Sequence, residues 1–231
     1  MKNEINNILL LTPRLYPCDT GGVELFHYFF IYSISKYFNV FVCTQCWQLE
    51  NKKNVHIHCY PAKFCCSSYL SHIFYQTKFI LKNRKTIDFI HMPYSSKSKL
   101  QNYHILVLSR LLNIPYILRI HGGGMYPAHP HILHQKLFDA ASGIMAVSTP
   151  IKEEYERRHG KPISRIPSML PFRTPALPRD QIRKNLGFQE NDVILLFVGS
   201  IKGIKGPDVL LESMRIIGVD YMRTISVQLV Y

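Results

Sequence analysis

Hydrophobic and polar positions follow two alternating patterns along the chain. Short apolar runs with little internal alternation are typical of strands covered on both faces. They occupy residues 7–13, 39–45, 54–61, 88–93, 114–122, 143–148 and 163–169. Stretches with helical spacing separate them, at 22–37, 68–84, 97–112, 131–141 and 150–159. This order predicts an α/β fold in which residues 1 to 168 form one Rossmann-like open parallel sheet with helices on both faces.

The first helical stretch has a clear periodicity. Val23, Phe26, Phe30, Ile34 and Tyr37 recur every three or four residues, which predicts one core-facing stripe. Its aromatic content is more typical of a core than of a cofactor site.

The pattern changes after residue 168. Pro171, Pro175 and Pro178 fall within a few residues, so 169–190 are expected to be a proline-rich linker followed by a short helix. Residues 191–231 then begin a second α/β domain, with a buried strand at 192–200, a helix at 207–217 and a strand at 224–231. Because the chain stops there, this second domain is expected to be truncated.

Composition and charge narrow the function classes. The chain has 231 residues, of which 47% are hydrophobic and 19% charged, and this argues against disorder. No apolar stretch reaches membrane-spanning length and the N-terminus lacks a signal-peptide core, so a cytoplasmic protein is expected. The net charge of +13 fits an anionic small molecule, a membrane surface or nucleic acid. No nucleic-acid-binding motif is present, so that partner is not expected.

Six cysteines in a chain without a secretory signal are expected to be reduced thiols. Cys43 and Cys46 form a CxxC pair, and His56, His58 and Cys59 follow, so a zinc site is one interpretation. Cys43 lies in a predicted buried strand and no second CxxC follows at finger spacing. A structural role is therefore favoured, and no metal is expected.

Two glycine-containing turns follow predicted strands. Gly21 and Gly22 precede the first helix, where free N–H groups attract phosphate or carboxylate, although a plain turn explains them as well. His121 ends another strand and is followed by Gly122, Gly123 and a third glycine, which clear space beside it. An HGGG oxyanion turn of an esterase is an alternative. It is disfavoured because no GxSxG nucleophile motif occurs.

A third cluster lies at 197–214, FVGSIKGIKGPDVLLESM. Three glycines, together with Lys202 and Lys205, connect a predicted strand to a helix, which is a phosphate-binding arrangement. A solvated turn is the alternative.

Taken in order, TP…GGVE, DFIH, IPYILRIHG, GIMAVS, RIPSM, RKNLG and FVGSIKGIKGPDVLLES resemble the GT-B glycosyltransferases of family GT4 (glycosyl transferases group 1). The resemblance spans nearly the whole chain. It implies sugar transfer with retention from a UDP- or GDP-linked donor, without a cofactor or metal, to a polysaccharide or glycolipid acceptor.

The resemblance also implies residue roles. Gly21 and Gly22 would face the donor phosphates, and His121 would lie beside the transferred sugar as the catalytic residue. Lys205 would neutralise the leaving diphosphate, as developing charge requires. Ser200 stands where the family often has arginine, and Lys202 would supply the missing contact. The acceptor side would involve Glu24, Gly122 and Gly123.

Two departures qualify this expectation. The linker reads Pro167-Ser168-Met169 where the family usually has PNG, and the chain ends before the family's paired glutamates. A truncated copy with little activity alone is therefore expected. The alternative is a degenerate, non-catalytic domain that binds an acceptor or a membrane surface. Lys78, Lys82 and Lys85 could meet anionic headgroups at the inner face of a membrane, or be a solvated face.

Overall fold

The computed structural model describes residues 5–12, 14–18, 21–49, 52–61, 68–94, 99–122, 132–168, 177–197, 199 and 203–217. It divides the chain into two compact units, Met1–Pro171 and Phe172–Tyr231. Among the described residues, none of the helices has the length and apolar content needed to cross a membrane.

The larger unit is built on a seven-stranded sheet of order β3-β2-β1-β4-β5-β6-β7, in which every pairing is parallel. The strands are β1 (Asn7–Leu11), β2 (Asn39–Thr44), β3 (Val55–Cys59), β4 (Phe89–Tyr94), β5 (Tyr116–Ile120), β6 (Gly143–Ala146) and β7 (Ser164–Arg165). Six of them fall within runs predicted from the sequence, and β4 extends one residue beyond its run at 88–93, so the predicted parallel sheet is confirmed.

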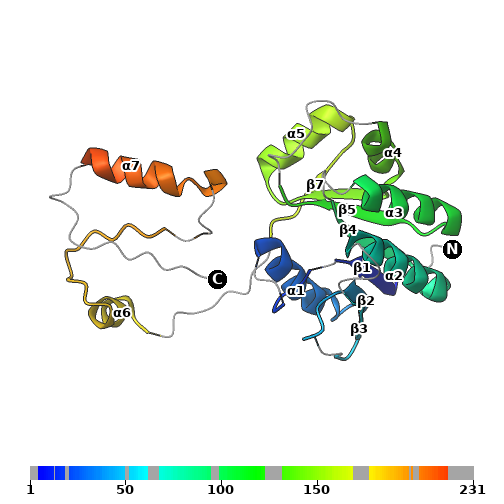
Figure 1. The fold of residues 1–231 in the computed structure, drawn as a ribbon, viewed down its shortest axis with the longest axis horizontal. Coiled ribbons are helices and arrows are strands. Elements are labelled where there is room, and N and C mark those ends of the chain that lie inside the picture. The colour runs from blue at the N-terminus through cyan, green and yellow to red at the C-terminus, as the bar shows by residue number, and fades with distance from the viewer. Residues whose placement is uncertain are drawn as a thin grey trace. The chain divides into compact units, whose positions relative to one another are not determined.

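Five helices connect these strands. They are α1 (Gly22–Ile34), α2 (Ser68–Asn83), α3 (Lys99–Leu112), α4 (Ile132–Ala140) and α5 (Thr149–His159). The chain proceeds from β1 outward to β3 and then returns to the other side of β1. Right-handed crossovers therefore place α1 on one face of the sheet and α2 to α5 on the other (Figure 1).

The core has two parts, one on each face of the sheet. Leu9 and Leu11 belong to the cluster under α2 to α5, whereas Leu10 belongs to the cluster under α1, as the two-residue period of a strand requires. The stripe predicted on the first helix is partly wrong. Val23 is exposed in the first turn of α1, and Tyr37 is exposed because the helix ends at Ile34.

The expectation that all cysteines are reduced is also wrong. Cys18 and Cys46 form a disulfide, with their Cα atoms 5.5 Å apart. Because β1 and β2 are neighbouring parallel strands, the loops that leave their carboxyl ends meet at one edge of the sheet. Cys43 remains a free thiol, buried in the core cluster under α2 to α5, whereas Cys46 lies in the cluster under α1. The two cysteines of the CxxC pair therefore have different environments.

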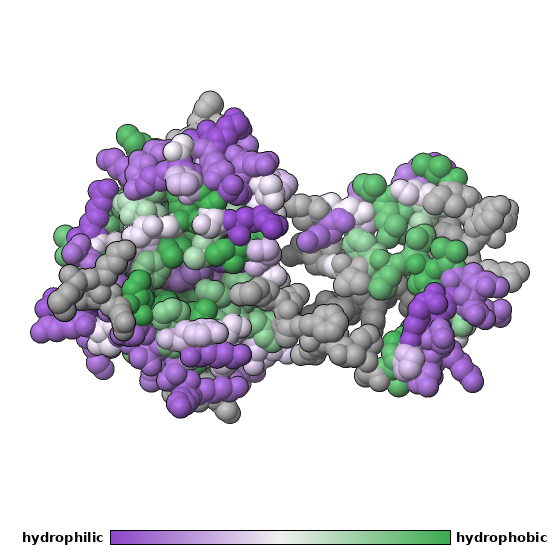
Figure 2. All heavy atoms as spheres, turned by 180° about the vertical axis from the view of Figure 1, so that it is seen from behind, coloured by the Kyte–Doolittle hydropathy of each residue, from purple (hydrophilic) through white to green (hydrophobic). Residues whose placement is uncertain are grey.

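The smaller unit contains α6 (Arg179–Asn185), a 3₁₀ turn η1 (Gly203–Lys205) and α7 (Pro207–Ile217). The buried strand predicted at 192–200 is absent from the described part of this segment, where 192–197 join no ladder and Val193 is 88% exposed. An apolar run needs a neighbouring strand to become buried, and the candidate at 224–231 lies outside the described residues. Figure 2 shows hydrophobic residues gathered on the visible surface of this unit.

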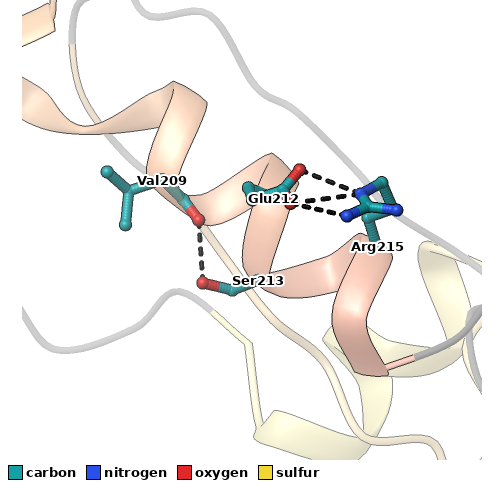
Figure 3. A network of polar contacts seen from close by, with 4 residues as sticks. All are labelled: Val209, Glu212, Ser213 and Arg215. Atoms are coloured by element: carbon teal, nitrogen blue, oxygen red, sulfur yellow. Dashed lines mark hydrogen bonds and ion pairs between the residues drawn. The ribbon is translucent and has the colours of Figure 1, made fainter.

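Helix α7 is held by local contacts. The Ser213 hydroxyl donates to the Val209 carbonyl, and the Arg215 guanidinium forms a bidentate pair with Glu212 (Figure 3). Such an exposed pair one turn apart contributes little to stability, because solvent screens the two charges. Met214 is the side chain that α7 buries among those described.

Candidate functional site at the carboxyl edge of the sheet

The strand order defines where a ligand would bind in the larger unit. Connections from β1 and from β4 leave toward opposite faces of the sheet, so the order reverses between these two neighbouring strands. Open α/β sheets bind ligands at the carboxyl ends of the strands beside such a switch point. The segment from β1 to α1 and the end of β5 both reach this edge, and they carry the glycines and the histidine singled out from the sequence.

Helix α1 begins at this edge. Gly21 is its N-cap, in extended conformation, and as a glycine it supplies no side-chain cap to the first turn. The Gly21 carbonyl accepts the first helical hydrogen bond, from the Leu25 N–H at 2.9 Å. The remaining N–H groups of the first turn point out of the helix, where they and the helix dipole favour an anion.

The glycines at this edge differ in what surrounds them. Among the residues that the structure describes, a Cβ atom on Gly22 or on Gly122 would meet nothing within 4 Å. A Cβ atom on Gly21 would collide with the carboxylate of Glu24, which folds back over the turn. The arrangement leaves room for a ligand beside Gly22 and Gly122, with one carboxylate at its border.

His121 packs against the second turn of α1. Its ring centroid lies 5.2 Å from that of Phe26 and 5.0 Å from that of His27. Burial, and then the charge of Arg119, lower the pKa of His121 to about 4, so the imidazole is neutral near pH 7. The structure therefore brings His121 to the helix that Gly21 and Gly22 begin, although its ring contacts are with the residues that follow them.

Two further histidines lie behind His121. His27 and His91 are almost completely buried, and their rings lie 5.9 Å apart in an edge-on arrangement. Neither has a hydrogen bond of ordinary geometry within the described residues. Burial is the main cause that lowers the pKa of His91 to about 3, and it also lowers that of His27. Both imidazoles are thus neutral, and they form a polar but uncharged layer under the site.

Arg119 is a fully buried cation two residues before His121. Its guanidinium lies 3.9 Å from the centre of the Phe26 ring and donates to the carbonyls of Ile166 and Pro167 at 2.9 and 3.4 Å. Burial lowers the pKa of Arg119 to about 10, so it stays charged at neutral pH. The described residues supply no carboxylate partner for it, which leaves a net positive potential beneath this edge of the sheet.

Lys205, the predicted diphosphate ligand, lies in the smaller unit. It is exposed at the end of η1, immediately before α7. Gly206, which follows it, has φ of 66°, a left-handed conformation that favours glycine. Lys202, Ser200 and Gly123 lie outside the described residues.

The sequence did not reveal His27, His91 or Arg119 as site residues. His91 and Arg119 occur within the apolar runs DFIHMP and IPYILRIHG, which were assigned to buried strands as a whole. The sequence did offer one signal for Arg119, which is its position. Arg119 lies two residues before His121, so both side chains lie on the face of the sheet that α1 covers.

The described elements define an α/β protein of Rossmann type, with candidate ligand contacts at the switch point. No sequence-family profile matches the chain, and no curated protein matches it. Solved structures do match the chain in fold. Alr3699/HepE of Anabaena, in complex with UDP, has a TM-score of 0.62 and 15% identity, covering 90% of this chain and 57% of its own. A glycosyltransferase from Rickettsia africae has a TM-score of 0.61 and 15% identity, over 94% and 58%.

The catalytic domain of starch synthase IV from Arabidopsis thaliana, bound to ADP and acarbose, has a TM-score of 0.60 and 10% identity, over 99% of this chain and 75% of its own. The chain thus spans 57% and 58% of the first two structures. At these identities the likeness establishes the fold, which is the α/β Rossmann-like architecture of GT-B glycosyltransferases.

Proposed function

We propose that the chain serves a retaining, GT4-like glycosyltransferase reaction. A sugar, most simply a hexose, moves from a UDP- or GDP-linked donor to a polysaccharide or glycolipid acceptor. The observation that carries this proposal is the meeting, at the β1–β4 switch point, of three features: the N-terminus of α1 at Gly21, Gly22 and Gly122 without close neighbours among the described residues, and a neutral His121. The neighbours that share this fold include proteins solved with UDP and with ADP.

In this proposal the donor diphosphate lies against the start of α1. Gly21 and Gly22 let the phosphates approach the backbone N–H groups closely, and the buried Arg119 adds a positive potential below them. Lys205, with Lys202 and Ser200, neutralises the charge that develops on the leaving diphosphate. The donor's charge is met by protein groups, so no metal is required.

His121 contacts the transferred sugar in this proposal. A neutral imidazole can accept a hydrogen bond on one nitrogen and donate from the other, so it can orient a hydroxyl without adding charge. Positioning of this kind contributes to the rate by holding the reacting groups in near-attack geometry. Glu24, Gly122 and Gly123 lie on the acceptor side.

We also propose a cytoplasmic protein that contacts the inner face of an anionic membrane. The second candidate function is a non-catalytic domain that binds an acceptor or a membrane. One observation favours it, namely the exposure of the apolar run 193–196 in the unit that would bind the nucleotide.

The test is release of nucleoside diphosphate from UDP- and GDP-sugars by the purified chain, together with calorimetric titration of UDP. His121→Ala should abolish release while UDP still binds, because the imidazole contacts the sugar and not the nucleotide. The matched control is His56→Ala, an exposed histidine on β3. Failure to bind any nucleotide would refute the proposal, and saccharide binding without release would favour the non-catalytic candidate.

A further inference from the structure

Helices α2 and α3 expose an apolar surface of six large side chains. On α2 these are Leu70, Phe74 and Leu81, each 45–54% exposed. On α3 they are Leu100, Tyr103 and Leu111, each 45–74% exposed. Within each helix the spacings of three, four, seven, eight and eleven residues place the three side chains on one side of the helix. We call these six residues the α2–α3 surface.

A direct contact joins the two stripes. Thr77 Oγ1 on α2 and His104 Nε2 on α3 lie 2.6 Å apart, within hydrogen-bond distance. Thr77 falls between Phe74 and Leu81 on its helix, and His104 lies one turn after Leu100 on the other. The helices lie on the same face of the sheet (Figure 1), so both stripes belong to one continuous side of the larger unit.

Basic side chains border this surface. Leu70, Phe74, Lys78 and Lys82 follow one another at four-residue steps, so the apolar stripe of α2 continues into exposed lysines. Lys85 does not share this face, because α2 ends at Asn83. After burial, the charges of Lys82 and Lys78 lower the pKa of His58 on β3.

Neither helix contains an acidic residue. The sequences SYLSHIFYQTKFILKN and KLQNYHILVLSRLL have no aspartate or glutamate, and α3 carries the exposed Arg110 in its last turn. The apolar stripe is thus bordered by cations that no acidic residue of either helix neutralises. Such a surface is complementary to a partner whose outermost layer is negatively charged and whose next layer is apolar. A second copy of this chain, itself at +13, would bring like charges together.

We infer that the α2–α3 surface docks on an anionic lipid bilayer. Leu70, Phe74 and Leu100 enter the headgroup boundary, while Lys78 and Lys82 extend to the phosphates. The first turns of α2 and α3 follow the carboxyl ends of β3 and β4, at the same sheet edge as His121. A lipid-linked acceptor in that bilayer would thus be held at the edge where the sugar is transferred.

This inference rests on one part of the proposed function, namely that the protein contacts an anionic membrane. Lipid binding requires neither donor nor turnover, so vesicle co-sedimentation tests it alone. Transfer to a soluble acceptor tests the reaction alone.

The experiment uses the full chain with vesicles of pure phosphatidylcholine and with vesicles that also contain phosphatidylglycerol. We expect binding to the anionic vesicles only, weakened by salt. Each basic residue near such a surface strengthens binding about fivefold, so Lys82→Glu, which changes the charge by two units, should weaken it about 25-fold. Phe74→Ser should also weaken it, and the loss should persist at high salt. Circular dichroism confirms that each variant is folded.

Lys36→Glu and Tyr37→Ser are the matched controls. Both residues are exposed just after α1, and the substitutions make the same changes in charge and apolar area there. Unchanged binding by these controls supports the inference. Equal binding to neutral and anionic vesicles, equal losses in test and control variants, or a dimer that Phe74→Ser dissociates would each overturn it.

Discussion

The buried neutral histidines should make the larger unit sensitive to acid. His27 and His91 are almost fully buried, and burial holds the pKa of each below its ordinary value near 6.5. The unfolded chain therefore binds more protons than the folded chain once the pH falls below about 6.5. The stabilisation is fully present above that pH and is lost progressively as the pH falls toward the folded pKa, about 3 for His91.

The magnitude follows from proton linkage. Between about pH 7.5 and about pH 5.5 an unfolded histidine changes from about a tenth protonated to about nine-tenths, while folded His91 stays neutral. The unfolded state gains a factor of about ten, which is about 1.4 kcal/mol for each such histidine. His91 alone should therefore cost about 1.4 kcal/mol, a sizeable share of the 5–15 kcal/mol that is typical of a domain. His27, whose pKa burial also lowers, adds a loss of the same sign. So do His104, His121 and His159, whose pKa burial lowers to about 4.

Urea unfolding followed at a series of pH values measures this loss directly. His91→Leu should remove about 1.4 kcal/mol of this loss, because folded His91 stays neutral over the range. The substitution should leave no hydrogen-bond partner unpaired, because the ring nitrogens of His91 have none among the described residues. His56→Leu makes the same substitution at an exposed position on β3 and is the control. A free energy of unfolding that stays constant over this range, or a full slope in His91→Leu, would refute the reasoning.

Three further results are expected. Tyr116→Phe removes a buried hydroxyl that donates to a backbone carbonyl at 2.5 Å, and should lower the free energy of unfolding by about 1 kcal/mol or more; no change in urea midpoint would contradict this. Cys18→Ser opens a disulfide that spans 28 residues and should cost about 3 kcal/mol under non-reducing conditions, with no difference from the wild type once a reductant is added. Arg119→Met removes the nearby cation and should raise the pKa of His121 from about 4, as measured by NMR titration; a value that does not rise would exclude this effect of Arg119.

The fold of the larger unit was predictable because its strands are covered on both faces. The centre of such a run, as at 40–43 or 116–118, is then apolar at every position, and the helical stretches between runs fix the parallel connections. The same reasoning failed at 192–200. An apolar run shows that a segment gains from burial, but burial as a strand also needs a neighbour, which the described residues do not provide.

The candidate site was predictable only where the conformation of the backbone, or its place at the end of a strand, requires a particular type of residue. Glycines before a helix, as at Gly21, indicate a close approach to the chain, and a histidine at a strand end points to the ligand-binding edge. A polar residue inside an apolar run carries no such mark, because its partners depend on strand order and on which helix covers that face. The Cys18–Cys46 disulfide was missed for the same reason, since it depends on β1 and β2 being neighbours.

Arg119 is a charged side chain at a position of the core where an apolar one would be expected. A core that only stabilised the fold would place an apolar side chain there, because a buried cation without an acid is costly. Here the cation contacts Phe26 on α1 and the carbonyls of Ile166 and Pro167, where the chain leaves β7 toward the proline-rich segment. One side chain on β5 thus contacts both the second turn of α1 and the segment by which the chain leaves β7. While these hydrogen bonds hold, the segment at Ile166 and Pro167 cannot shift relative to β5, which carries His121 at its end. The cost of burying the cation is therefore offset by a fixed position for the imidazole.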